Sequence, residues 1–377
     1  MPASWLTTPP SARWPDDGDE ANPYVRYRRL LWSWHRAVEH GWTDDDFVAM
    51  VRDIDDAVAG VDGHGFTVTP AGWVDALSGN GAPARVFAKD ETHNVGGSHK
   101  ARHLMGVALH LLVDEALGAE PPEVLAIASC GNAALAAAVV ARALDRTLRV
   151  FVPTWADTSV VARLTELGAD VRVCERRSGE SGDPTDLRFR EAVEGGARAF
   201  GVQGTDTPTT FDGGRTLGWE LADQVPDLDR IYVQVGGGAL ATAVSTALPG
   251  AVLHPVQAEG CAPLRRAWDR MAPGFDLEEA AADPDRYMWP WADPRSLASG
   301  ILDDITYDWV PLLRRTLESG GEPVVAAEED VVAARALGRE HTGLDVSATG
   351  TAGLAGLLAA PPPSGERVAV LFTGVQR

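Results

Sequence analysis

The sequence predicts an α/β protein with two lobes, each built on a mostly parallel sheet flanked by helices. From about residue 84 onward, short apolar runs typical of strands alternate with longer stretches whose apolar residues recur at helical spacing. Several runs, such as residues 124–128, are continuously apolar, as expected for strands buried on both faces. The chain of 377 residues is also long enough for two packed lobes. Such alternation is typical of parallel sheets covered by helices.

Caps and breakers set the limits of the predicted elements. Thr43, followed by three aspartates, predicts the start of an N-terminal helix, because acids at this end complement the helix dipole. Residues 272–306 are predicted to be irregular, with a lid, a dimer contact and a plain insertion as equal alternatives. Besides the helix that follows Lys100, strands are predicted at 124–128, 148–152, 171–174, 199–202, 231–235, 252–258 and 368–372, and helices at 133–144, 158–167, 187–193, 216–225, 239–248, 331–341 and 351–358.

Composition excludes several classes of function. The formal net charge is −21, so phosphate backbones and anionic membrane surfaces would be repelled, and neither nucleic acid nor membrane is an expected partner. The three cysteines are scattered without metal-type spacing, which predicts no metal site and no disulfide framework. The sequence shows no signal peptide and no apolar run of membrane-spanning length. We therefore expect a cytoplasmic protein.

Two lysines stand out, because the other 31 of the 33 Lys and Arg residues are arginine. A guanidinium stays protonated and cannot form a Schiff base, whereas a lysine amine can lose its proton and attack a carbonyl. Lys100 follows a Gly-Gly-Ser-His segment and begins an apolar helix, which indicates a covalent anchor for pyridoxal phosphate; a surface lysine is the alternative. Lys89 lies beside two acids, where a salt-bridged or solvated lysine is the plainer interpretation.

Three further segments lie where predicted strands end. Glycines 236–238, followed by Ala239 and Leu240, open a helix whose amides can approach a phosphate; an ordinary strand–helix turn is the alternative. Residues 129–132, Ser-Cys-Gly-Asn, combine a hydroxyl, an amide and free helix amides, which suits a carboxylate, although a plain helix cap would use the same residues. Thr373 ends the last strand, where its hydroxyl can face a pyridine nitrogen or simply terminate the strand.

Together these segments resemble the second fold type of pyridoxal-phosphate enzymes, the tryptophan synthase β superfamily, and look most like threonine synthases and related lyases. The likeness covers residues 84–377. Ala133 departs from the pattern, because amino-acid dehydratases usually carry histidine there. The motifs that carry the resemblance are Ser98-His99-Lys100, Ser129 to Asn132, Gly236 to Leu240 and Thr373, in the family's order.

The resemblance implies a role for each matching residue. Lys100 would be the catalytic residue and hold pyridoxal 5'-phosphate in a cleft between the two domains. The cofactor would also contact Asn132, Thr373 and the segment Gly236, Gly237, Gly238, Ala239 and Leu240. The substrate carboxylate would be bound by Ser129, Gly131 and Asn132. The implied domains are an N-terminal, partly helical extension over 1–70, a large cofactor-binding domain over 71–122 and 206–377, and a small domain over 123–205. A homodimer is expected from the family.

The predicted activity is a lyase or synthase acting on a small L-amino acid or its activated derivative, as expected in amino-acid metabolism. Removal of the α-proton by Lys100 would precede β- or γ-elimination, as in threonine synthase. The alternatives are a serine- or threonine-type ammonia-lyase and a β-replacement synthase. A more remote alternative is a non-catalytic binding protein that has kept this fold.

Overall fold

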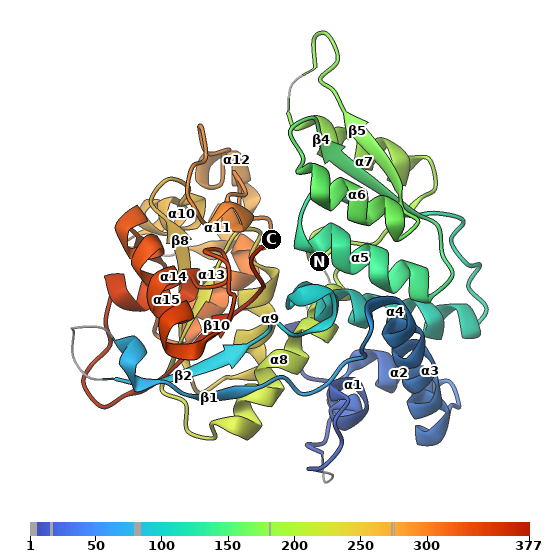
Figure 1. The fold of residues 1–377 in the computed structure, drawn as a ribbon, viewed down its shortest axis with the longest axis horizontal. Helices are drawn as coiled ribbons and strands as arrows, with labels where there is room; N and C mark the ends of the chain where they lie inside the picture. Colours follow the sequence, from blue (N-terminus) through green and yellow to red (C-terminus); the bar gives the residue numbers. More distant parts are fainter. Residues whose placement is uncertain (1–5, 16–17, 79–83, 181, 273, 275) are drawn as a thin grey trace. The chain divides into compact units, whose positions relative to one another are not determined.

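The computed structural model describes residues 6–15, 18–78, 84–180, 182–272, 274 and 276–377 (Figure 1). The chain divides into two compact units: unit 1 is Met1–Val68 and Asn94–Thr216, and unit 2 is Thr69–His93 and Leu217–Arg377. Each unit contains one mostly parallel sheet flanked by helices, so the predicted α/β class is confirmed. The predicted domain boundaries at residues 70, 122 and 205 stay a prediction. Within the described residues, no helix is long and apolar enough to cross a membrane.

Unit 1 has a four-stranded, wholly parallel sheet in the order β5-β4-β3-β6. Helix α7 covers one of its faces, where Phe189 packs with Ala126, Phe151 and Cys174. The strands are β3 (Leu125–Ala128), β4 (Leu148–Pro153), β5 (Asp170–Cys174) and β6 (Arg198–Ala199), and the helices that follow them are α5 (Asn132–Ala143), α6 (Thr158–Glu166) and α7 (Pro184–Glu194).

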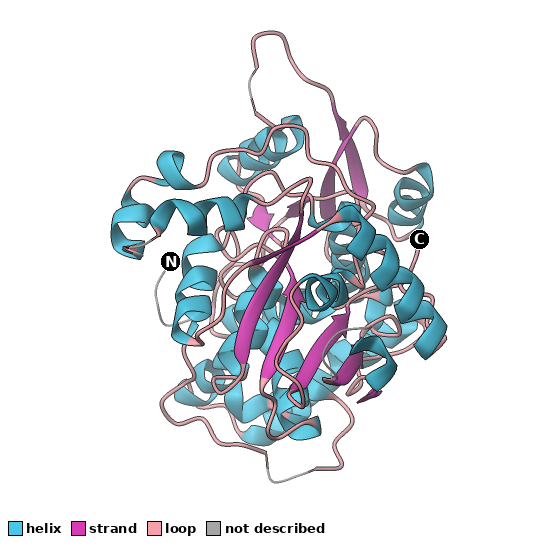
Figure 2. Ribbon diagram, turned by 90° about the vertical axis from the view of Figure 1, so that its left-hand side faces the viewer, coloured by secondary structure: helices cyan, strands magenta, loops and turns pink. Residues whose placement is uncertain are grey.

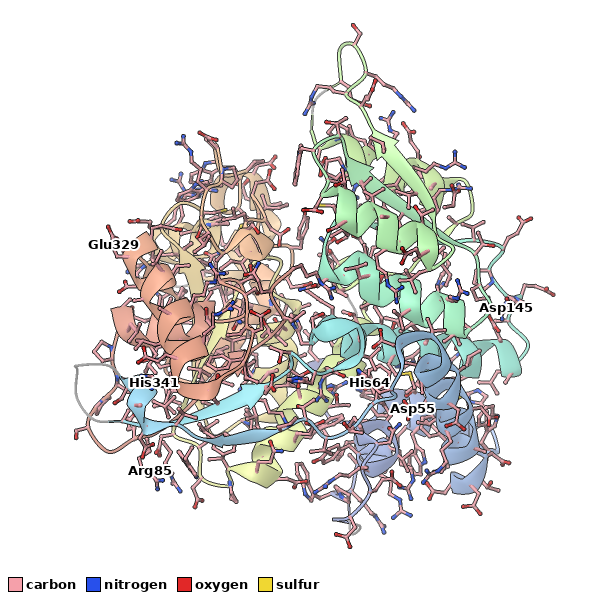
Figure 3. All side chains as sticks on the ribbon, viewed as in Figure 1. Asp55, His64, Arg85, Asp145, Glu329 and His341 are labelled. Atoms are coloured by element: carbon pink, nitrogen blue, oxygen red, sulfur yellow. The ribbon has the colours of Figure 1, made fainter. Side chains whose placement is uncertain are left out.

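The N-terminal helices also belong to unit 1. They are α1 (Pro23–Arg26), α2 (Trp32–Glu39) and α3 (Asp44–Asp62), followed later in the chain by α4 (Lys100–Ala116). Thr43 caps α3 in a capping box with Asp46, as its sequence predicts. Asp55 of α3 accepts a hydrogen bond from the Phe66 backbone at 2.7 Å, and burial raises the pKa of this carboxyl (Figure 3).

Unit 2 has a six-stranded sheet in the order β1-β2-β10-β7-β8-β9, in which only the β1–β2 pairing is antiparallel (Figure 2). Its interior strands are almost fully buried, which explains their continuous apolar runs. The strands are β1 (Ala71–Trp73), β2 (Arg85–Asp90), β7 (Arg230–Gln234), β8 (Val252–Ala258), β9 (Val324–Ala326) and β10 (Arg367–Phe372).

The helices of unit 2 include several that the sequence pattern does not predict. Within the segment 272–306, described except for residues 273 and 275, two short helices and a 3-10 turn replace the expected irregular chain. The helices are α9 (Ala239–Ala247), α10 (Pro263–Met271), α11 (Leu277–Ala282), α12 (Pro284–Tyr287), α13 (Trp309–Glu318), α14 (Glu328–Thr342) and α15 (Ala352–Ala359).

Helix α8 (Thr210–Gln224) begins six residues before the predicted start at Thr216. Two adjacent glycines in its first turns disfavour a helix by propensity. In unit 1, however, Gly213 of α8 packs directly on Gly106 of α4, and a Cβ on either glycine would overlap the other's backbone. The close helix–helix contact therefore overrides local propensity.

Candidate active site

Lys100 is the first residue of α4, and its lead-in is a tight glycine turn. Gly96 and Gly97 have φ of 65° and 68°, and the Gly96 amide donates to Asp62 Oδ2 at 2.9 Å. These left-handed conformations favour glycine, which explains the Gly-Gly pair in the sequence. The lead-in packs on α5, because a Cβ on Gly96 would lie 3.6 Å from Ala136 Cα. The structure thus brings the Lys100 segment beside the helix that follows the Ser129 loop.

Ser98, two residues before Lys100, offers a buried polar atom to a ligand. Its side chain is fully buried, and its Oγ has no hydrogen-bond partner among the described residues. Buried hydroxyls are rarely left in this state, because the missing bond costs about 1–3 kcal/mol. An orphaned hydroxyl on the same turn as a primary amine fits a polar cofactor.

The segment from Ser129 to Asn132 connects β3 to α5. Ser129 Oγ accepts a long contact of 3.4 Å from the Gly131 amide, and within the described residues no side-chain hydrogen bond caps α5. The carboxylate site and the plain helix cap both stay predictions. Uncapped amides at a helix start attract anions, and a carboxylate is one of them. Cys130 in this loop is half-buried, and burial raises the pKa of its thiol, so it stays protonated at neutral pH.

The glycine turn belongs to unit 2 and joins β7 to α9. Gly238 is the N-cap of α9 with φ of 102°, and none of the described side chains caps this helix. A Cβ on Gly236 would overlap the Asp303 side chain, and one on Gly238 would lie 3.2 Å from Thr306 Cγ2. Both positions therefore favour glycine. The turn leaves backbone amides as its donors, which suits a phosphate.

Thr373 directly follows β10 and is buried. Because β10 pairs in parallel with β7, the carboxyl ends of both strands lie at the same edge of the sheet. The Gln234 side chain, at the end of β7, donates from Nε2 to Thr373 Oγ1 at 2.8 Å. The structure thus brings Thr373 and the glycine turn together within unit 2. Gln234 was not predicted; a polar residue in an otherwise apolar strand was its only signal.

His103 lies one helical turn after Lys100 and also belongs to unit 1. It is buried, and its Nδ1 lies 2.9 Å from the Thr210 carbonyl, which can only accept. Burial, followed by the nearby positive charge of Lys100, lowers the pKa of His103 to about 3. The imidazole is therefore neutral at physiological pH and adds no positive charge beside the Lys100 amine.

Lys89 has a structural role in unit 2. Its Nζ donates to Glu220 Oε2 at 2.6 Å, and both side chains have 0% exposure. The salt-bridged alternative is therefore correct.

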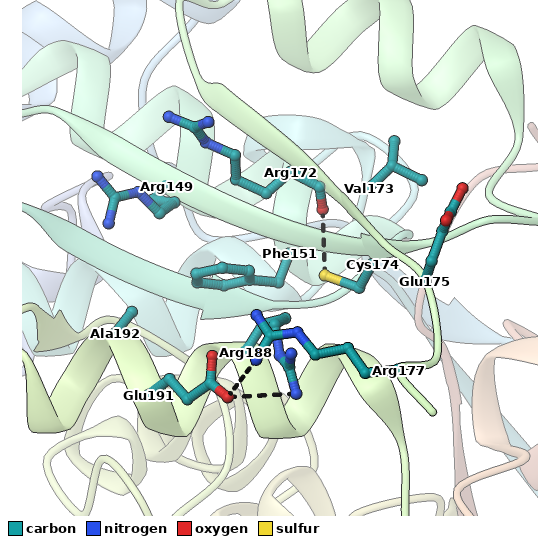
Figure 4. A pocket seen from close by; sticks show the side chains of 10 residues that line it. All are labelled: Arg149, Phe151, Arg172, Val173, Cys174, Glu175, Arg177, Arg188, Glu191 and Ala192. Atoms are coloured by element: carbon teal, nitrogen blue, oxygen red, sulfur yellow. Dashed lines mark hydrogen bonds and ion pairs between the residues drawn. The ribbon is translucent and has the colours of Figure 1, made fainter. Parts of the chain in front are cut away.

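A separate cavity of about 730 Å³ in unit 1 is lined by four arginines from β4, β5, α7 and the loop between β5 and α7 (Figure 4). All four are ion-paired with carboxylates, so this cavity does not offer the unpaired cations that a phosphate would require.

The profile of the family described as "Pyridoxal-phosphate dependent enzyme" matches residues 64–374. The chain belongs to this family. Its cofactor is therefore pyridoxal 5'-phosphate. Each unit by itself has donors that fit this group: unit 1 has a primary amine, the Ser98 hydroxyl and the start of α5, and unit 2 has the start of α9 and a buried threonine hydroxyl.

Individual relatives narrow the comparison. The chain is 25% identical over 301 residues to L-threonine ammonia-lyase of Thermotoga maritima, covering 77% of this chain and 66% of that protein, just under two thirds of its length. It is 25% identical over 280 residues to human serine racemase, covering 72% and 74%. The structure of threonine deaminase isoform 2 from Solanum lycopersicum shares the fold, with a TM-score of 0.64 at 18% identity over 89% and 91% of the two chains.

These comparisons support one of the predicted alternatives better than the main prediction. Fold type II and pyridoxal phosphate are confirmed. The two sequence relatives named above, however, are an ammonia-lyase and a racemase, and neither supports a particular likeness to threonine synthase. A serine- or threonine-type ammonia-lyase was one of the alternatives that the sequence motifs predicted.

Proposed function

We propose that this protein is an ammonia-lyase acting on a small β-hydroxy L-amino acid of the serine or threonine type. The uncapped start of α5, preceded by Ser129, is the observation that carries the proposal, because it offers a compact carboxylate site in the same unit as Lys100. The ammonia-lyase and racemase relatives support the same substrate class. A homodimer and a cytoplasmic location remain predictions.

Each residue has a distinct proposed task in holding the cofactor. Lys100 Nζ would bind it covalently, and the amides of Gly236, Gly237, Gly238, Ala239 and Leu240 would bind its phosphate. Thr373 Oγ1 would face the ring nitrogen and Asn132 the ring hydroxyl. When bound, pyridoxal phosphate supplies an electron sink for the negative charge that develops at the substrate α-carbon.

The protein's own groups would then bind and deprotonate the amino acid. The hydroxyl of Ser129, the amides near Gly131 and the side chain of Asn132 would hold the substrate carboxylate. Lys100 Nζ, once released, would accept the α-proton as general base.

The test has a chemical and a spectral arm. We expect wild-type protein incubated with L-serine or L-threonine to release ammonia and the 2-keto acid in equal amounts. Lys100→Ala should abolish this release and also lose the visible absorption of the covalently bound cofactor. Absence of keto acid over a broad panel of amino acids would contradict the proposal.

Other products would identify the alternatives. Formation of the D-enantiomer without ammonia would indicate a racemase. Phosphate release from an O-phospho amino acid, or addition of an external thiol, would indicate the threonine-synthase-like or β-replacement reactions. An unchanged spectrum in Lys100→Ala would contradict the assignment of the anchor itself.

A further inference from the structure

Gln234 makes an unusually dense set of contacts beside Thr373, entirely within unit 2. It is 4% exposed, and its Nε2 lies within hydrogen-bond distance of four oxygens. These are the carbonyls of Thr349 at 3.1 Å, Gly350 at 2.9 Å and Leu371 at 3.2 Å, and the hydroxyl of Thr373 at 2.8 Å. The contact with the hydroxyl is the shortest of the four.

The three carbonyls fix which end of the amide faces Thr373. Carbonyl oxygens only accept hydrogen bonds, so a side-chain oxygen in this position would be repelled by all three. The amide must therefore present its NH₂ group, and Gln234 Oε1 lies on the other side without a partner among the described residues. Rotation of the amide by 180° would place Oε1 against the three carbonyl oxygens and exchange three favourable contacts for unfavourable ones.

We propose that Gln234 is a positioning residue that holds Thr373 as a hydrogen-bond donor toward an unprotonated ring nitrogen of the cofactor. A hydroxyl has one proton and accepts through its oxygen. Gln234 can only donate at this contact, so Thr373 accepts there and cannot direct its own proton to Gln234. The positive end of the amide dipole also disfavours a protonated ring nitrogen nearby.

This inference rests on the proposed role of Thr373 and explains how the chain would control it. A threonine alone can donate or accept, so it does not by itself select a protonation state. The amide at the end of the neighbouring strand removes one of these options, because it cannot accept the Thr373 proton. An unprotonated ring withdraws charge more weakly, which favours early loss of a leaving group over a long-lived carbanion.

The test is ¹⁵N NMR of the resting holoenzyme containing ring-¹⁵N-labelled pyridoxal phosphate, followed over pH without substrate. Wild-type protein should show an unprotonated ring nitrogen. In Gln234→Met the amide donor is lost, so Thr373 Oγ1 is no longer held as its acceptor and can accept from a protonated ring instead. We expect the proton affinity of that nitrogen to rise about tenfold, because one hydrogen bond contributes about the free energy of a tenfold change in an equilibrium constant. Tyr232→Phe is the matched control.

Tyr232 lies on the same strand, and its hydroxyl donates to the Ala360 carbonyl at 2.6 Å, so its loss removes one hydrogen bond without touching Thr373. The ¹⁵N signal of the cofactor ring in Tyr232→Phe should match that in the wild type. Should Gln234→Met fail to fold, Gln234→Asn keeps a polar amide but is one methylene shorter, so this amide does not reach the position of Gln234 Nε2, and the same change is expected. A protonated ring in wild-type protein, or an unchanged signal in the folded Gln234 variant, would overturn the inference. Either result would leave the lyase proposal standing, because no turnover is measured.

Discussion

Replacing Lys89 by methionine should separate the two lysines by function. The Lys89 Nζ donates to Glu220 Oε2 at 2.6 Å, to the Thr69 carbonyl at 2.7 Å and to Gln224 Oε1 at 3.0 Å. Because Glu220 is fully buried, the variant leaves a carboxylate in the interior without its cation. Loss of one partner of such a pair costs about 3–5 kcal/mol, a large part of a typical stability of about 5–15 kcal/mol.

Urea unfolding, followed by far-ultraviolet circular dichroism, would measure this loss. Lys89→Met should unfold at much lower urea yet keep the visible absorption of the bound cofactor. Lys100→Met should do the reverse, since Lys100 is only partly buried and begins a helix. Adding Glu220→Gln to Lys89→Met removes the buried negative charge and should recover part of the loss. A cost below about 1 kcal/mol, or a double variant no more stable than the single one, would refute the reasoning.

Two more predictions concern pH and the glycine turn. Since burial lowers the pKa of His103 from 6.5 to about 3, the unfolded chain binds a proton that the folded chain does not. Stability should therefore be complete above about pH 6.5 and fall on acidification, by about 2 kcal/mol from about pH 8 to about pH 5; in His103→Gln, urea unfolding at both pH values should show a smaller loss. Gly238→Ala places a Cβ at φ of 102° and 3.2 Å from Thr306 Cγ2, so it should cost about 1–2 kcal/mol and weaken cofactor binding in an equilibrium titration. Gly320→Ala, at φ of 74° with open space around it, should cost similar stability but leave cofactor affinity unchanged.

The sequence alone determined the local parts of this protein. Apolar runs and helical periodicity predicted most strands of both sheets and most of the helices that flank them, because both patterns depend on residues a few positions apart. The scarcity of lysine singled out Lys100, since no arginine can perform its chemistry. The Gly-Gly-Gly turn was visible for a similar reason: only glycine allows the backbone to approach a ligand so closely.

Only the tertiary structure decided which distant residues act on one another. Lys89 and Glu220 are 131 positions apart, and Gln234 and Thr373 are 139 apart, so no periodicity links them. The early start of α8 likewise depends on Gly106 of another helix. Such pairings follow from the order of the strands and the packing of the helices. These bring distant residues together only when the chain has folded. The sequence alone places Thr373 at the end of the last strand. That Thr373 accepts a hydrogen bond there depends on Gln234 of the neighbouring strand.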